Sequence, residues 1–250
     1  MSNDSSNNAE GTEPEVGDND LTMSSPDKSN VAETPNESIP GYRILKELSR
    51  GGQGVVYQAL QKSARRKVAV KVMLQGPFGG SESKRRFERE IAQVGSLRHP
   101  NIVPIYDSGV AQGQCYYAMA YIRGKRLNEY VRGEGLSVKR TLKLFKTVCD
   151  AVSYAHQKGV IHRDLKPSNI LVDDSGQPHV LDFGLAKVGG AEIEDESQSM
   201  LLSVTGQVIG SPAYMCPEQA AGQPDQIDMR SDVYALGVIL YELLTETHPY

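Results

Sequence analysis

The hydrophobic pattern of this 250-residue chain changes its period along the sequence, and this change limits the folds that the chain can adopt. Residues 42–75 alternate between apolar and polar side chains as half-buried strands do, with a glycine cluster after the first apolar run. From Ser81 to Leu97 the apolar residues recur at helical spacing, and Ile102–Asp107 and Cys115–Tyr121 return to the strand pattern. We therefore expect a small β-rich unit with one helix.

The second half of the sequence is mainly helical. Thr141–His156 carries one apolar stripe, and Gly159 stands where helix C-termini often have a glycine. Loops and short strands are expected over residues 160–184, and Ser231 is the expected N-cap of a last helix. Because strands and helices are segregated along the chain, the sequence predicts an α+β fold in two parts.

The first forty residues differ from the rest, since Ser, Asn, Asp, Glu and Pro dominate their composition. They hold nine acidic residues and one basic residue, a net charge of -8, so the other 210 residues carry +4 of the total of -4. Such a segment buries too little apolar surface to offset its ordering entropy. We expect residues 1–41 to form a disordered acidic tail, with a partner-binding arm as the alternative.

The composition excludes several classes of protein. Hydrophobic residues make up 39% and charged residues 23%, as in ordinary globular proteins. A charge of +4 over the folded part is too weak to indicate nucleic-acid binding. There is no apolar run of about 18 residues that would indicate a membrane segment. The three cysteines lack CxxC spacing, so we expect free thiols and a cytoplasmic location.

A glycine-rich segment, Ser49–Val56, lies between the first two expected strands. Glycine lets backbone N–H groups approach a phosphate without an obstructing side chain. A hairpin turn would use the same residues, so this segment alone does not indicate a function.

A strand lysine and a helix glutamate form the second candidate pair. Strand alternation places Ala69 and Lys71 on one face, so Ala69 can cover a flat base while Lys71 reaches phosphates. Glu90 lies at the edge of the apolar stripe of the following helix, where its carboxylate can fix the Lys71 ammonium. The alternatives are a solvated lysine and a surface glutamate in a charged stretch.

The segment His162–Asn169, which reads HRDLKPSN, is the most specific motif. Asp164 can accept a hydroxyl proton, and Asn169, five residues later, can ligate Mg²⁺. Lys166 adds a cation for a phosphoryl group in transfer. Asp182 opens an Asp-Phe-Gly tripeptide thirteen residues after Asn169, and its carboxylate can bridge Mg²⁺ to phosphates.

With these motifs in this order, the chain resembles the eukaryotic-like protein kinase superfamily, and most of all its bacterial Ser/Thr branch. The branch-level resemblance rests on Gly51–Tyr57, Gly210–Ala220 and Asp228–Gly237. It implies an ATP-dependent Ser/Thr protein kinase that uses Mg²⁺ and moves the γ-phosphate to Ser or Thr hydroxyls of protein substrates.

The resemblance covers residues 42–250 and implies the two-lobed protein kinase fold. The small β-rich N-lobe with one helix would span about residues 42–121, and the larger, mainly helical C-lobe about residues 122–250. A kinase domain normally continues through several more helices, which hold the usual Arg partner of Glu218. The resemblance therefore implies a truncated C-lobe, and membrane anchoring through residues beyond 250 stays open.

The resemblance also implies a role for each motif residue. Asp164 would be the catalytic base with Lys166 beside the γ-phosphate, and Asn169 and Asp182 would hold Mg²⁺. Lys71 would act with them, paired with Glu90 in the active state. The residues implied to form the ATP site are Leu48, Ser49, Arg50, Gly51, Gly52, Gln53, Gly54, Val55, Val56, Ala69, Lys71, Glu90, Met119 as gatekeeper, Ala120 and Ile122 in the hinge, and Leu171.

Further implied features concern support and regulation. Asp232 would brace the catalytic loop, and His162 and Phe183 would stack. Arg163 precedes the catalytic Asp, and in kinases with this Arg a phosphate on the activation segment orders the loop. Thr205 is the expected main site, which implies autophosphorylation and allows dimerisation for phosphorylation in trans.

The chain departs from the family pattern at four positions within its motifs. Ser49 replaces the first glycine of the loop, Cys216 the Ala of the Ala-Pro-Glu motif, Ser211 the Thr of the usual Gly-Thr, and Ala120 a common hinge Glu. Three alternatives stay open beside an active kinase: a nucleotide-binding pseudokinase scaffold, a small-molecule kinase and an inactive kinase fragment. Pseudokinases tend to lose Lys71, Asp164, Asn169 or Asp182, and this chain keeps all four.

Overall fold

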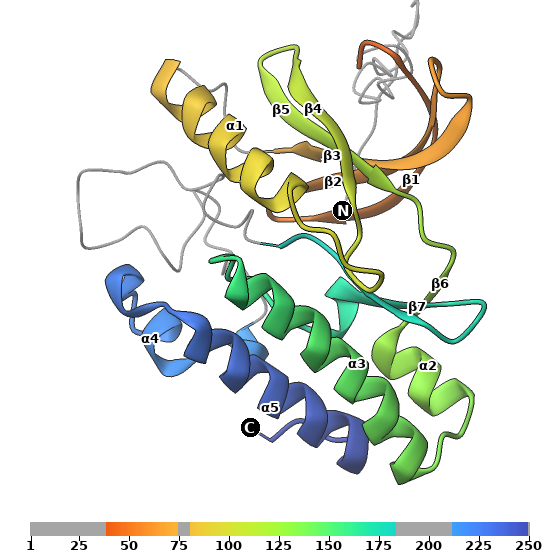
Figure 1. The fold of residues 1–250 in the computed structure, drawn as a ribbon, viewed down its shortest axis with the longest axis vertical. Helices are drawn as coiled ribbons and strands as arrows, with labels where there is room; N and C mark the ends of the chain where they lie inside the picture. The colour runs from red at the N-terminus through yellow and green to blue at the C-terminus, as the bar shows by residue number, and fades with distance from the viewer. Residues whose placement is uncertain (1–38, 75–80, 184–211, 250) are drawn as a thin grey trace, which may run out of the picture. The chain divides into compact units, whose positions relative to one another are not determined.

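The computed structural model describes residues 39–74, 81–183 and 212–249. Figure 1 shows five strands and helix α1 grouped in one part and helices α2, α3 and α5 grouped in the other. The predicted α+β fold, with a β-rich N-lobe and a helical C-lobe, is confirmed. The expected tail lies almost wholly outside the described residues.

The N-lobe is built on an antiparallel sheet of five strands in the order β1-β2-β3-β5-β4. Strand alternation gives the sheet two apolar faces. Val68 and Val70 pack on one face with Tyr116 of the neighbouring strand, while Ala69 and Met119 contribute to the main core on the other. The strands are β1 (Tyr42–Gly51), β2 (Gly54–Gln61), β3 (Arg66–Met73), β4 (Ile105–Ala111) and β5 (Gln114–Ala120).

Helix α1 (Ser81–Gly95) contributes to the main core. Phe87, Ile91 and Val94 are all buried there, which is the stripe that the helical spacing predicts. The strand expected at Ile102–Asp107 begins later and ends later than predicted: β4 runs from Ile105 to Ala111, and Pro104 before it cannot donate to a sheet hydrogen bond. The bounds of β5 differ from the prediction by one residue at each end.

The C-lobe core lies between α3 (Val138–Gln157) and α5 (Met229–Thr245), which contact each other. Gly159 follows α3 in the left-handed conformation (φ +74°), as its predicted place after the helix requires. Asp228, and not Ser231, is the N-cap of α5, because its carboxylate accepts the amide of Arg230. The hydroxyl of Ser231 instead donates to Glu218 of α4.

A small three-stranded sheet, in the order β6-β7-β8, and several short helices complete the described residues. The amide of Val103 donates to the carbonyl of Val180 (3.0 Å), which ties the N-lobe to this small sheet. The remaining elements are β6 (Gly124–Arg126), α2 (Leu127–Gly133), η1 (Pro167–Asn169), β7 (Ile170–Asp173), β8 (Pro178–Val180), η3 (Pro212–Tyr214), α4 (Pro217–Ala220) and η4 (Pro224–Gln226). None of the described helices is long and apolar enough to cross a membrane.

Gly54 is fixed by the pairing of β2 with β3. A Cβ atom at this position would lie 2.5 Å from the Val72 carbonyl oxygen, whereas a Cβ at Gly52 meets nothing within 4 Å. Gly54→Ala should therefore lower the free energy of unfolding by about 1–3 kcal/mol. The matched variant Gly52→Ala should stay within about 0.5 kcal/mol of wild type. Urea denaturation followed by circular dichroism measures both, and equal stabilities would contradict this account.

Candidate active site

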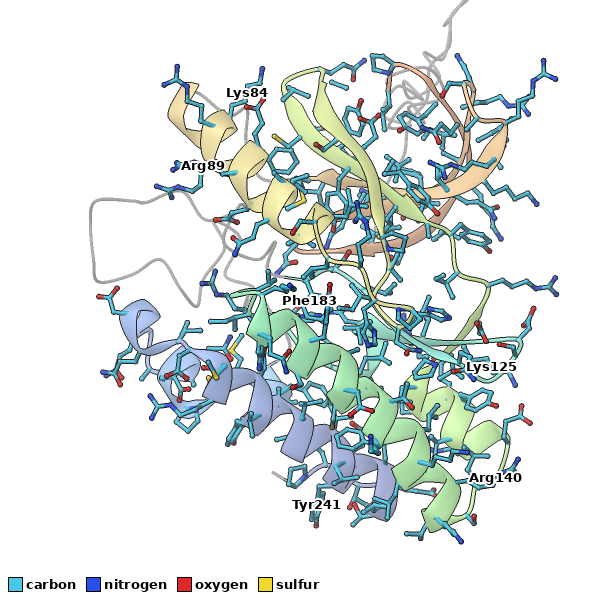
Figure 2. The ribbon with its side chains drawn as sticks, viewed as in Figure 1. Lys84, Arg89, Lys125, Arg140, Phe183 and Tyr241 are labelled. Carbon is cyan, nitrogen blue, oxygen red and sulfur yellow. The ribbon has the colours of Figure 1, made fainter. Side chains whose placement is uncertain are left out.

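The site is assembled around the loop that follows α3 and the segment that follows β8. The carbonyl of Leu181 accepts the ring Nε2 of His162 (2.8 Å), and the amide of Leu181 donates to the carbonyl of Asn169 (2.9 Å). The rings of His162 and Phe183 lie 4.8 Å apart, which confirms their predicted contact. Figure 2 shows Phe183 between the N-lobe sheet and the C-lobe helices. These contacts hold the two segments against each other.

Asp164 is held by two side chains of its own loop. Lys166 Nζ donates to both carboxylate oxygens, at 3.0 and 2.8 Å. Asn169 Nδ2 donates to the Asp164 carbonyl (2.7 Å) and also to Oδ2 (3.2 Å). The Asp164 side chain remains 22% exposed, so a second molecule can reach it. The motif spacing has thus brought the carboxylate, the ammonium and the amide into one cluster.

Asp232 of α5 fixes the backbone of the loop that carries Asp164. Its carboxylate accepts the backbone amides of His162 and Arg163, both at 2.8 Å, and lies 2.7 Å from Nε2 of His156. Burial by itself raises the pKa of Asp232, but these hydrogen bonds and the nearby imidazoles outweigh burial, so its pKa lies below the usual value. The predicted bracing of the loop is confirmed, and His156 is a partner that sequence reasoning missed.

Arg163 adopts the left-handed backbone conformation (φ +68°), which is unusual for a residue other than glycine. Its carbonyl accepts the side-chain amide of Gln219 (2.7 Å), which ties the loop to α4. Burial lowers the pKa of the Arg163 guanidinium, against the opposing charges of Glu90 and Asp232. Gln219 was not foreseen, because nothing in its sequence position shows where α4 docks.

Lys71 of β3 points at Asp182, and the two form a buried ion pair with Nζ–Oδ2 of 2.8 Å. Burial by itself raises the pKa of Asp182, but the charge and hydrogen bond of Lys71 outweigh it, so the pKa is lowered. The Lys71–Glu90 pair that the resemblance implies for the active state is not among the ion pairs of the described residues, where Lys71 pairs with Asp182. The physical reason is that Asp182 lies in the same buried space, while the charge of Glu90 acts on Arg163.

The glycine-rich segment forms the end of β1, a tight turn and the start of β2. Ser49 pairs with Val56 and Gly51 with Gly54, so Leu48 to Val56 make one hairpin. A Cβ added at Gly51 or Gly52 would meet open space. The packing of the protein does not require glycine at these two positions, which fits a close approach of their backbone to a ligand. Arg50 of this hairpin bonds to Glu47, and Gln53 accepts the amide of Leu74 through its carbonyl.

The residues expected around adenine come from β2, β3, β5 and β7. Ala69 and Met119 stand opposite each other in register, and both are buried. The amide of Ala120 donates to the carbonyl of Pro104 (3.1 Å), which fixes the chain as it leaves β5. Leu171, Ile122 and Val56 are half-buried and Val55 is buried. Val56 and Ile122 pack against the main core.

The donor set near the loop fits a hard divalent cation bound with phosphates. No group of three or more His, Cys, Asp or Glu side chains that could hold a metal occurs among the described residues. Two carboxylates and one amide, from Asp164, Asp182 and Asn169, belong to segments joined by hydrogen bonds. Mg²⁺ is usually held by one or two carboxylates together with phosphate oxygens and waters, so such a set fits it.

Two expectations concern the segment before α4. Thr205, the expected phosphorylation site, lies outside the described residues. Glu218, at the start of α4, accepts a hydrogen bond from the hydroxyl of Ser231 (2.7 Å). Ser231, which the sequence predicts as the N-cap of α5, therefore uses its side chain in this contact. Cys216 is buried and is the N-cap of α4, so the Ala-to-Cys departure leaves a small buried side chain in place.

Comparison with known proteins places the chain among kinases. The family model of the protein kinase domain matches residues 42–250. The kinase PrkC of Bacillus subtilis is 39% identical over 210 residues, covering 84% of this chain and 31% of that protein. PknD of Protochlamydia amoebophila is 37% identical, with 84% and 23% covered. PknB of Mycobacterium tuberculosis is also 37% identical, with 87% and 34% covered. All three are named as serine/threonine-protein kinases, and the chain spans about a quarter to a third of their lengths.

A solved kinase-domain structure has a similar fold. The crystal structure of the Mycobacterium tuberculosis PknI kinase domain superposes with a TM-score of 0.65 at 28% identity. The match covers 88% of this chain and 78% of that domain. The similarity therefore extends over both lobes.

Asp232→Asn should lower the free energy of unfolding by about 2–4 kcal/mol, because two buried amides and an imidazole lose a charged acceptor. Since the folded state lowers the pKa of Asp232, its contribution is present above the unfolded value near about 4 and is lost as the pH falls through the folded value. The difference between variant and wild type should narrow below about pH 4.

The matched control is Asp150→Asn on the exposed face of α3, where Asp150 pairs with Lys146 and both side chains are more than half exposed. It should cost at most about 1 kcal/mol. Urea unfolding at several pH values separates the two variants, and a loss for Asp232→Asn no larger than that of the control would contradict its supporting role.

Proposed function

The chain belongs to the protein kinase family, and on that premise we propose that its domain transfers the γ-phosphate of ATP to Ser and Thr hydroxyls of other proteins. The names of the relatives support the residue class, because all three compared above are serine/threonine-protein kinases. Lys166, two residues after the proposed base, is the residue typical of the Ser/Thr branch.

The observation that carries the proposal is the arrangement around Asp164. Its carboxylate is oriented by Lys166 and Asn169 and is partly exposed. A carboxylate held in this way can accept the proton of a substrate hydroxyl as that oxygen attacks phosphorus. Lys166, which donates to Asp164, brings a positive charge to the place where charge builds up on the transferring phosphoryl group.

Lys71 and the glycine-rich hairpin are proposed to bind the phosphates of ATP. The Lys71 side chain is largely buried, and its Nζ lies 2.8 Å from the Asp182 carboxylate. The backbone of Gly51 and Gly52 has no neighbouring atoms within reach of an added Cβ, which leaves room for phosphate oxygens. Ala69, Met119, Ala120, Ile122 and Leu171 would surround the base.

Protein kinases use ATP together with Mg²⁺, and the donors that would hold the metal here are Asn169 and Asp182. When bound, Mg²⁺ supplies positive charge that neutralises the phosphate oxygens. The part played by the chain is to present oxygen donors from two segments that the Leu181 hydrogen bonds keep in register. Catalysis would then rest on positioning and on fixed charges.

Wider features of the protein belong to the same proposal. Membership of the kinase family implies protein substrates. The proposal also includes a cytoplasmic site of action and autophosphorylation, with dimerisation for phosphorylation in trans. The cysteines support a reducing compartment, since all three are free thiols. A nucleotide-binding scaffold is not favoured, because the relatives are named as kinases.

Asp164→Ala in the full-length protein should lower kcat by about 10²–10⁴-fold, the range for loss of a general base. Lys71→Met should nearly abolish transfer as well. Transfer of radiolabelled phosphate from ATP to a Ser/Thr peptide is the measurement, and Asp174→Ala serves as control because Asp174 is 70% exposed on the β7–β8 turn. If Asp164→Ala kept the kcat of the wild type, Asp164 would not be the catalytic base.

Asp182→Asn should weaken the dependence of nucleotide binding on Mg²⁺, because one of the two proposed oxygen donors loses its charge. Calorimetric titration with ADP at increasing Mg²⁺ measures this. The wild type should gain affinity with Mg²⁺, and the variant should gain much less. If the variant responded to Mg²⁺ as the wild type does, Asp182 would have no part in holding the metal.

A further inference from the structure

Tyr117 of β5 contacts the proposed metal-binding carboxylate, although no motif includes it. In the pairing of β3 with β5, Tyr117 stands directly opposite Lys71. Residues opposite each other in an antiparallel pair present their side chains on the same face of the sheet. Both side chains therefore point to the same place, and Tyr117 is fully buried there, with 0% of its surface exposed.

Lys71 and Tyr117 each donate to a different oxygen of the Asp182 carboxylate. Lys71 Nζ donates to Oδ2 at 2.8 Å, and the Tyr117 hydroxyl donates to Oδ1 at 2.7 Å. An ionised carboxylate only accepts hydrogen bonds, so the tyrosine hydroxyl is the donor in this contact. Each oxygen of the carboxylate thus has its own donor.

We propose that Tyr117 is a positioning residue for Asp182, whose hydroxyl competes with the divalent cation for the Oδ1 oxygen. The proposal rests on the metal role given to Asp182 above. Mg²⁺ would be held by the Asp182 carboxylate, and a cation on Oδ1 would share that oxygen with the proton that the Tyr117 hydroxyl donates to it. Because both partners are positive, each would weaken the binding of the other to this oxygen.

The competition has a defined consequence for binding. The hydroxyl stabilises the metal-free pairing of Asp182 and so raises the Mg²⁺ concentration that nucleotide binding needs. Tyr117→Phe removes the donor while keeping the ring that fills the core. It should lower the Mg²⁺ midpoint for ADP binding by about 10- to 150-fold, the range for one hydrogen bond to a charged group.

The matched control is Tyr116→Phe on the same strand. Tyr116 points to the opposite face, where its ring lies 6.0 Å from that of Tyr42. The same hydroxyl is removed from the same strand, without any contact to Asp182 in the described hydrogen bonds. The Mg²⁺ midpoint of Tyr116→Phe should equal that of the wild type.

The experiment titrates Mg²⁺ into full-length protein with ADP at fixed concentration and follows binding by calorimetry, with no turnover required. Affinity for ADP in EDTA should be the same for wild type and Tyr117→Phe, so a lower midpoint reports on the metal alone. A midpoint that is unchanged or higher in Tyr117→Phe overturns the proposal. Should Tyr117→Phe fold poorly by circular dichroism, Tyr117→Met provides the same test with an unbranched side chain.

Asp182→Asn separates this proposal from the function on which it rests. If Asp182→Asn binds ADP with the Mg²⁺ dependence of the wild type, the metal role of Asp182 itself fails. If Asp182→Asn loses that dependence while Tyr117→Phe behaves as wild type, the metal role stands and only the competition by Tyr117 is refuted. A lower midpoint in Tyr117→Phe together with loss in Asp182→Asn supports both.

Discussion

The carboxylate of Asp232 is the interaction on which the rest of the site depends. It is 1% exposed, it is carried by the central helix of the C-lobe, and it accepts the backbone amides of two consecutive residues, His162 and Arg163. A buried charge is tolerated only when hydrogen bonds replace its water. Moving either amide away would leave the buried carboxylate without a donor, so both amides are fixed in position. Arg163 can then keep a left-handed backbone that turns the chain towards Asp164.

From this fixed loop the order spreads to the N-lobe through polar contacts. His162 bonds to the carbonyl of Leu181, and the next residue, Asp182, reaches Lys71 on β3. The two lobes are therefore joined at the site by an ion pair whose halves lie 111 residues apart. Because a low-dielectric interior strengthens such a pair and penalises either partner alone, the positions of the β3 strand and the Asp182 segment depend on each other.

The sequence alone was sufficient for those features that depend on local spacing. The strand and helix periods located the N-lobe sheet and the stripe of α1, and the spacing of Asp164 and Asn169 predicted their cluster. Features that depend on tertiary packing were missed. Asp182 replaced Glu90 as partner of Lys71, Ser231 bonded to Glu218 rather than capping α5, and Tyr117 became visible only through strand register. Each of these outcomes is decided by which groups meet across elements, which no local pattern records.

The same contacts give the site a balance of charge that bears on how it binds. Each of its two carboxylates has a lysine of its own: Lys166 for Asp164 and Lys71 for Asp182. The protein side chains therefore satisfy one another, and an anionic ligand meets cations that are already paired. Phosphates can bind only if they share these lysines with the carboxylates or if a cation compensates the carboxylates in their place. Nucleotide and metal should for that reason bind as coupled partners, since a metal held by Asp182 would replace Lys71 as the counter-charge of that carboxylate and leave Lys71 to the phosphates.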